Sequence, residues 1–67
     1  MTAATDVQDF NAIVDVGDRV TVAMPGAAPR YTVTVAPAEL VGGWAIVRVQ
    51  GLCGGVSLAR VTPGWPA

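Results

Sequence analysis

Turn-forming residues divide most of this chain into short segments. From Asp15 onward, clusters of glycine, proline and aspartate separate four runs of strand-forming residues. These runs are residues 19–24, 30–35, 44–50 and 56–61. They follow one another at intervals of roughly a dozen residues, a spacing typical of small antiparallel sheets and barrels. The sequence therefore predicts an all-β domain, either a small barrel or a four- to five-stranded antiparallel meander.

The strand runs differ in how their apolar residues are distributed. Residues 19–24 place three apolar side chains on one face, and residues 30–35 alternate apolar side chains with two threonines. Residues 44–50 are apolar on both faces, as in a strand that is covered on two sides. Trp44 opens this run, and we expect it in the core, with an interface anchor as the alternative. Residues 36–43 are expected to form a loop or a short helical turn.

The first fourteen residues follow a helical pattern instead. Thr5 and Gln8 have the spacing of a capping box, and Phe10 shares one helical face with two valines. We expect a short helix at about residues 6–13, with an ordered extended arm as the alternative. The predicted organisation is an N-terminal arm or short helix (1–14), a small β-barrel (15–63) and a C-terminal tail (64–67).

The size and composition of the chain point to association with a partner. It has 67 residues, and a domain of about 60 residues buries only roughly 60% of the surface that its unfolded chain exposes. Small domains often add disulfides or a metal, but this sequence has one cysteine and no histidine. Hydrophobic residues make up 52% and charged residues 13%, against about 25% charged residues in ordinary soluble domains. We therefore expect a protein partner or self-association to cover part of the apolar surface.

Charge and hydropathy bear on the partner and the location. The net charge is −1, which does not favour a general nucleic-acid binder. The residues before Asp6 lack the basic and apolar stretches of a secretory signal, and no apolar run approaches the roughly 20 residues needed to cross a membrane. All positive charges are arginines, a bias that resembles proteins of high-GC genomes such as actinobacteria and their phages. We expect a virion or bacterial cytoplasmic location and no membrane partner.

Three segments carry a resemblance to a known family. Val16-Gly17-Asp18-Arg19-Val20-Thr21-Val22 resembles the opening strand of SH3-like small barrels, which include KOW-type and other bacterial or phage modules. Residues 43–49 and 58–63 resemble later strands of such domains, so the resemblance covers residues 16–63. It implies a small barrel that binds proteins or nucleic acid, or that helps to build phage particles, and that seldom catalyses a reaction alone.

The inventory of reactive residues does not favour catalysis. The chain lacks histidine for general-base work near neutral pH, and it lacks lysine for Schiff-base chemistry. Ser57 lies in a predicted strand without a base nearby, and Cys53 lies in a glycine-rich turn without neighbouring positive charge. Asp15 and Asp18 are too few for a cation site and are typical turn residues. We predict no catalytic residue, no metal site and no cofactor.

Aromatic and arginine residues are the best interface candidates, because these types are enriched at binding hot spots. Trp65 lies between prolines, where it either packs back on the domain or anchors a neighbour. We expect a structural or assembly module that docks on a larger complex, with a phage virion (capsid or head-associated) accessory protein as the leading hypothesis. The alternative is a small regulatory barrel that binds a host protein or nucleic acid. The interface candidates are Phe10, Trp44, Trp65, Arg30, Arg48 and Arg60.

Overall fold

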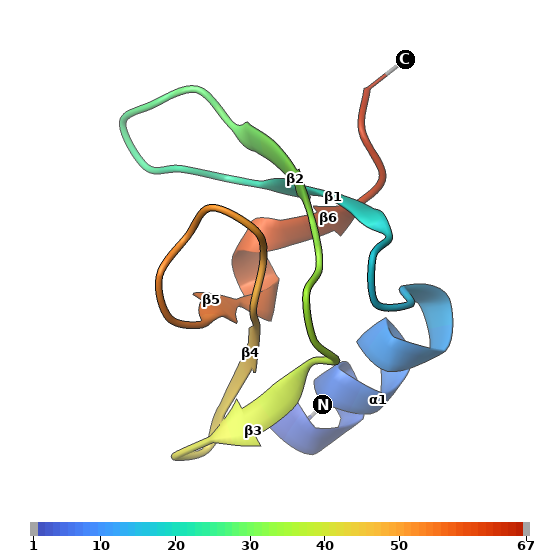
Figure 1. Ribbon diagram of the computed structural model, residues 1–67. Helices are drawn as coiled ribbons and strands as arrows, with labels where there is room; N and C mark the ends of the chain where they lie inside the picture. Colours follow the sequence, from blue (N-terminus) through green and yellow to red (C-terminus); the bar gives the residue numbers. More distant parts are fainter. Residues whose placement is uncertain (1, 67) are drawn as a thin grey trace.

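The computed structural model describes residues 2–66, which form one α-helix and six short strands (Figure 1). In chain order the elements are α1 (Ala3–Ile13), β1 (Arg19–Val22), β2 (Arg30–Val33), β3 (Glu39–Val41), β4 (Trp44–Val47), β5 (Val56–Ser57), the 3₁₀-helix η1 (Leu58–Arg60) and β6 (Val61–Pro63). The strands make two three-stranded antiparallel sheets, ordered β2-β1-β6 and β3-β4-β5. The prediction of a mainly β domain with a short N-terminal helix is confirmed.

The two sheets are linked where the chain leaves β2. Beyond that strand, Thr34 bridges to Val49, and the N–H of Val35 donates to the carbonyl of Arg48 at 3.0 Å. Strand β6 then returns to the other edge of β1, where Val61 pairs with Val22. In the described residues these bonds join two separate sheets and do not form one closed ladder.

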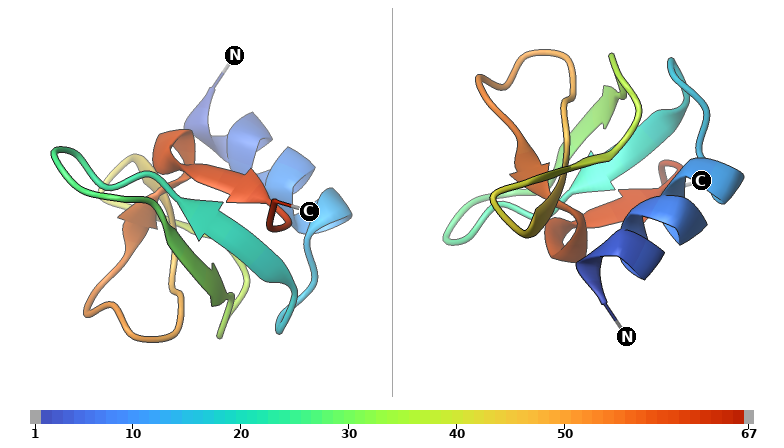
Figure 2. Two further views of the ribbon diagram at one scale, coloured as in Figure 1. Left: turned by 90° about the horizontal axis from the view of Figure 1, so that it is seen from above. Right: turned by 90° about the horizontal axis from the view of Figure 1, so that it is seen from below.

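Helix α1 packs against β3, β4 and η1, and Figure 2 shows it from above and from below. It begins earlier than predicted, because Thr2 is its N-cap: the Thr2 hydroxyl oxygen accepts a hydrogen bond from the N–H of Thr5 at 3.2 Å. The predicted cap at Thr5 is therefore wrong. Two alanines with high helix propensity follow Thr2 and add the extra turn. Val7 and Phe10 pack against the core, so this segment is an integral part of the domain.

The core consists of small side chains. Val20, Val22 and Val47 are fully buried, whereas Tyr31, Trp44 and Trp65 are exposed. Within residues 2–66, the buried hydrophobic residues are Val14, Val20, Val22, Ala38, Val47, Val49 and Val56. Trp44 is 74% exposed, so the prediction that it lies in the core is wrong. Trp44 lies on the face of β4 opposite to the buried Val47 and therefore points away from the core.

Strand β2 and its extension turn their polar face inward. Thr32 and Thr34 are buried, whereas Tyr31 and Val35 are exposed. Each threonine hydroxyl donates to a backbone carbonyl: Thr32 to Gln50 at 2.8 Å, and Thr34 to Asp15 at 2.9 Å. Burying a hydroxyl carries little penalty when it is hydrogen-bonded, and here the two bonds hold neighbouring loops against the sheet.

Two stretches differ from the predicted elements. The run at 56–61 is divided, because β5 gives way to η1, whose first turn is capped by the Ser57 hydroxyl, before β6 begins. The segment 36–43 contains strand β3 instead of being entirely loop or helical turn. Among residues 2–66, no helix is long and apolar enough to cross a membrane.

Candidate interaction surfaces

The most exposed aromatic side chain of the described residues lies at the start of β4. Strands β3 and β4 are joined by Gly42 and Gly43, whose φ angles of 57° and 84° are those of a type I′ turn. Trp44 follows this turn and pairs across the ladder with Val41, which is also exposed. We call residues 39–47 the Trp44 hairpin. It presents a large apolar side chain at the tip of a tightly defined turn.

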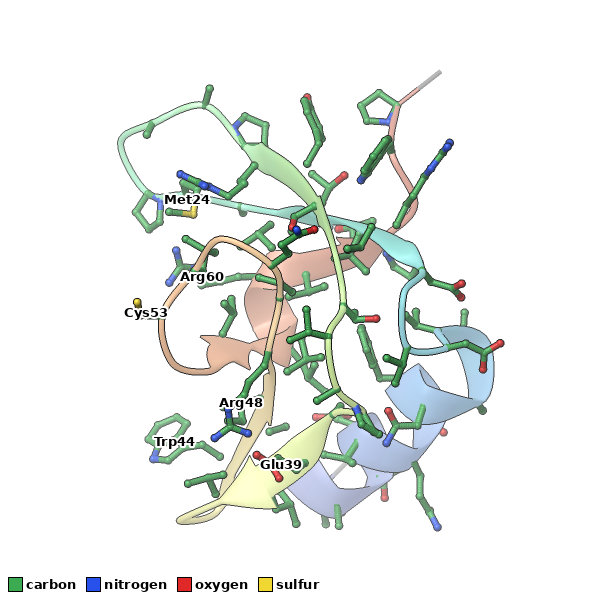
Figure 3. All side chains as sticks on the ribbon, viewed as in Figure 1. Met24, Glu39, Trp44, Arg48, Cys53 and Arg60 are labelled. Atoms are coloured by element: carbon green, nitrogen blue, oxygen red, sulfur yellow. The ribbon has the colours of Figure 1, made fainter. Side chains whose placement is uncertain are left out.

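Polar and packing contacts hold the base of the Trp44 hairpin in place. Arg48 forms an ion pair with Glu39 (Figure 3). Ile46 packs so closely on Gly55 that any side chain at position 55 would collide with it. The ion pair is half-exposed and therefore contributes only about 0–1 kcal/mol. By register, its two side chains lie on the same face of the hairpin as Trp44.

Trp65 has a different environment. Its indole N–H is shared between the carbonyls of Val20 at 3.0 Å and Thr32 at 2.9 Å, which are paired residues of β1 and β2. The Arg19 guanidinium lies 4.6 Å from the centre of the ring, a cation–π geometry. Of the two predicted alternatives, the structure shows the one in which Trp65 packs back on the domain. The ring is 42% exposed and lies on the outer surface of the sheet, since Val20 and Thr32 turn their side chains into the core.

A groove of about 400 Å³ lies between α1 and η1. Phe10, Leu58 and Ala59 make it largely apolar, and the side chains of Asp6 and Asp9 line it as well. Phe10 also packs on the core, so the aromatic surface in the groove is fixed in position. Neither aspartate forms an ion pair within residues 2–66. The groove therefore combines apolar surface with two carboxylates.

A smaller hollow, of about 190 Å³, is lined by residues that include Met24, Cys53 and Arg60 (Figure 3). The Arg60 guanidinium donates to the carbonyl of Ala23 at 3.0 Å and to the Met24 sulfur at 3.8 Å. Arg60 therefore acts mainly inside the fold, where it ties η1 to the end of β1. Arg30 is exposed at the start of β2.

The predicted interface residues do not gather at one site. Trp44 lies at the turn of the hairpin, Arg48 directly follows its second strand, and Phe10 lies in the groove. Arg30, Arg60 and Trp65 lie on other parts of the surface. Sequence reasoning missed the hairpin itself, although the Gly-Gly pair between two apolar segments is a hairpin signal. It also missed the two aspartates of the groove, because only the packing of η1 beside α1 brings them next to apolar residues.

Comparison of the chain with protein-family models, with curated proteins and with solved structures found no match. The functional inference therefore rests on the surfaces described above. Two of them expose apolar surface: the indole of Trp44 and the groove between α1 and η1.

Proposed function

We propose that this chain is a non-catalytic assembly module that docks on a larger protein complex through the Trp44 hairpin. The observation that carries the proposal is Trp44, a tryptophan that is 74% exposed at the tip of a two-glycine turn. Tryptophan is the residue type most typical of interface hot spots, and full burial of a large apolar side chain contributes about 1.5–3 kcal/mol. An indole left in water forgoes that contribution until a partner covers it.

The hairpin is suited to this role because it is already ordered. The type I′ turn, the ion pair of Arg48 with Glu39 and the contact of Ile46 with Gly55 all restrain it. A backbone segment that is ordered before binding loses little conformational entropy when a partner covers it. Val41, which pairs with Trp44 and lies on the same face of the hairpin, extends the exposed apolar surface beside it.

We further propose that the fold is related to SH3-like small barrels and that the complex is a phage virion. The resemblance of residues 16–63 and the return of β6 to the edge of β1 support the first point. Cationic residues that are all arginines, together with many alanines, valines and glycines, support a high-GC phage or host. Capsid or head-associated proteins are the class of partner that this proposal favours.

A nucleic-acid-binding role has less support. Of the four basic residues, Arg19 stacks on Trp65, Arg48 pairs with Glu39, and Arg60 donates to Ala23 and Met24. Arginines engaged in this way are poorly placed to contact phosphates, and phosphate contacts supply most non-specific affinity for nucleic acid. A regulatory barrel that binds a host protein would use the same hairpin, so the experiment below also detects it.

The test is site-specific photo-crosslinking in the particles or cells that contain the protein. A photoreactive residue at Val41, beside Trp44, is expected to capture one dominant protein, which mass spectrometry then identifies. The substitution Trp44→Ser is expected to abolish the crosslink, and Tyr31→Ser, at a similarly exposed residue of the other sheet, is expected to leave it unchanged. Equal crosslinking with and without Trp44 would contradict docking through the hairpin.

A further inference from the structure

The exposed indole and the groove lie on opposite sides of β4. Side chains alternate along a strand, so Trp44 points away from the face that carries Val47. Val47 is fully buried in the core, and α1 and the Phe10 side chain pack on that same side. Trp44 therefore cannot reach the groove between α1 and η1 of its own chain. Only the indole of another molecule can do so.

The groove suits an indole in size and in chemistry. A volume of about 400 Å³ is within the range of pockets that hold small organic groups. Phe10 and Leu58 offer apolar surface to the ring, and the carboxylates of Asp6 and Asp9 are acceptors for its N–H. A tryptophan that becomes buried normally needs such an acceptor.

Charge favours the same pairing. The chain from Met1 to Asp18 carries four aspartates and no basic residue, and two of these aspartates line the groove. On the other side of the contact, Arg48 follows Trp44 by four residues on the same face of the strand, where it is half-exposed and paired with Glu39. Residues 19–67 carry four arginines and one glutamate, so a region of net positive charge would meet a groove lined by two carboxylates.

We propose that copies of this chain associate head to tail, with Trp44 of one copy seated in the groove between α1 and η1 of the next. This inference rests on the proposed function, because it assigns a partner to the same hairpin. A contact that joins two different surfaces leaves one groove and one hairpin free at the ends of every open assembly. Repeated contacts of this kind build a ring if the rotation that relates successive copies closes on itself, and a filament if it does not.

The contact is small, which determines how it behaves. One indole buries about 150–250 Å², whereas stable interfaces bury about 800 Å² on each partner. The whole chain exposes 4318 Å². A single contact is therefore weak, and the assembly becomes stable only when ring closure or a larger scaffold makes several contacts act together.

The test is sedimentation velocity and light scattering over a concentration series that reaches the millimolar range. The wild-type chain is expected to grow beyond a dimer as its concentration rises. Trp44→Ser removes the indole, and Ala59→Arg fills the groove with a cation that pairs with its aspartates. Each variant alone is expected to require about a 10- to 100-fold higher concentration to associate. Tyr31→Ser is the surface control and is expected to behave as wild type.

Mixing the two variants identifies the geometry. The Trp44→Ser chain keeps its groove and the Ala59→Arg chain keeps its indole, so an equimolar mixture is expected to form heterodimers and nothing larger. Circular dichroism of each variant establishes that both remain folded. A wild-type chain that stays monomeric, or an Ala59→Arg chain that associates as wild type does, would overturn the proposal. In the first case, a Trp44-dependent crosslink to another protein would still support the proposed function.

Discussion

The two tryptophans of this chain have opposite roles in the same fold. Trp65 donates its indole N–H to two backbone carbonyls and stacks against Arg19. Trp44 makes no side-chain hydrogen bond within residues 2–66 and is 74% exposed. One ring is therefore part of the structure, and the other is available for binding. The comparison shows that the surroundings of an aromatic side chain, and not its residue type, decide which role it takes.

The largest expected effect is the difference in the free energy of unfolding between the variant that lacks Trp65 and the variant that lacks Trp44. Trp65→Ala is expected to lower the free energy of unfolding by about 2–4 kcal/mol, because it removes packing and two hydrogen bonds at the junction of β1 and β2. Trp44→Ala is expected to change it by less than about 0.5 kcal/mol. Urea titrations followed by circular dichroism measure both. Equal losses for the two variants would remove the distinction between the tryptophans.

The turn that presents Trp44 should give the next largest effect. Gly43 has a φ of 84°, where a side chain is strained, so Gly43→Ala is expected to lower the free energy of unfolding by about 1–2 kcal/mol. Asparagine tolerates positive φ better, and Gly43→Asn is therefore the matched variant with the smaller expected loss. Chemical denaturation of the two variants provides the comparison. An alanine variant as stable as the asparagine variant would show that the turn does not restrain the hairpin.

The cation–π contact of Arg19 with Trp65 is expected to contribute less to the free energy of unfolding than the turn does. Arg19→Ala should lower the free energy of unfolding by about 0.5–1 kcal/mol, the usual size of an exposed cation–π contact. Arg30→Ala removes an exposed arginine from the neighbouring strand and serves as the control, with a change within about 0.5 kcal/mol. The difference between the two variants, measured by urea unfolding, isolates the stacking contact. No difference would mean that Trp65 is held by its hydrogen bonds alone.

The smallest expected effect concerns the ion pair beside Trp44. Glu39→Gln should change the free energy of unfolding by less than about 1 kcal/mol, because the pair is half-exposed. It should nevertheless strengthen head-to-tail association, since Arg48 would then face the aspartates of the groove without a competing carboxylate. Sedimentation of the variant at low and high salt measures this, and the gain should shrink as salt rises. Weaker association of the variant would argue against the proposed contact.

The sequence predicted the element types better than the side-chain positions. Period-two alternation located β1 and β2, and helical spacing located α1. Alternation alone does not say which face is buried, and in β2 the threonines are inside because Gln50 and Asp15 offer carbonyls to their hydroxyls. Those partners come from distant parts of the chain, so no local pattern could have revealed them.

Packing between distant parts of the chain also explains two further features that the sequence did not reveal: the exposure of Trp44 and the docking of the N-terminal helix. Trp44 was expected in the core because β4 is apolar on both faces, but it lies on the face opposite to the buried Val47. The N-terminal segment was expected to be a short helix, with an ordered extended arm as the alternative, and nothing in its sequence showed where it would pack. In the structure, the Asn11 amide exchanges two hydrogen bonds with the backbone of Ala38, at 2.9 and 3.1 Å. This contact spans 27 residues of sequence and is therefore invisible to local patterns.

The pairing of β1 with β6 has a consequence for the order in which the molecule folds. The Thr21 hydroxyl donates to the carbonyl of Gly64 across 43 residues of sequence. In contrast, the β3–β4 turn pairs Val41 with Trp44, which are separated only by Gly42 and Gly43. Local turns form in microseconds, and contacts between distant residues form later because closing a long loop costs entropy. We expect the hairpin to be ordered before the first sheet is complete. A nascent chain would then display Trp44 before Trp65 has docked, so early partners could engage the molecule while it is still folding.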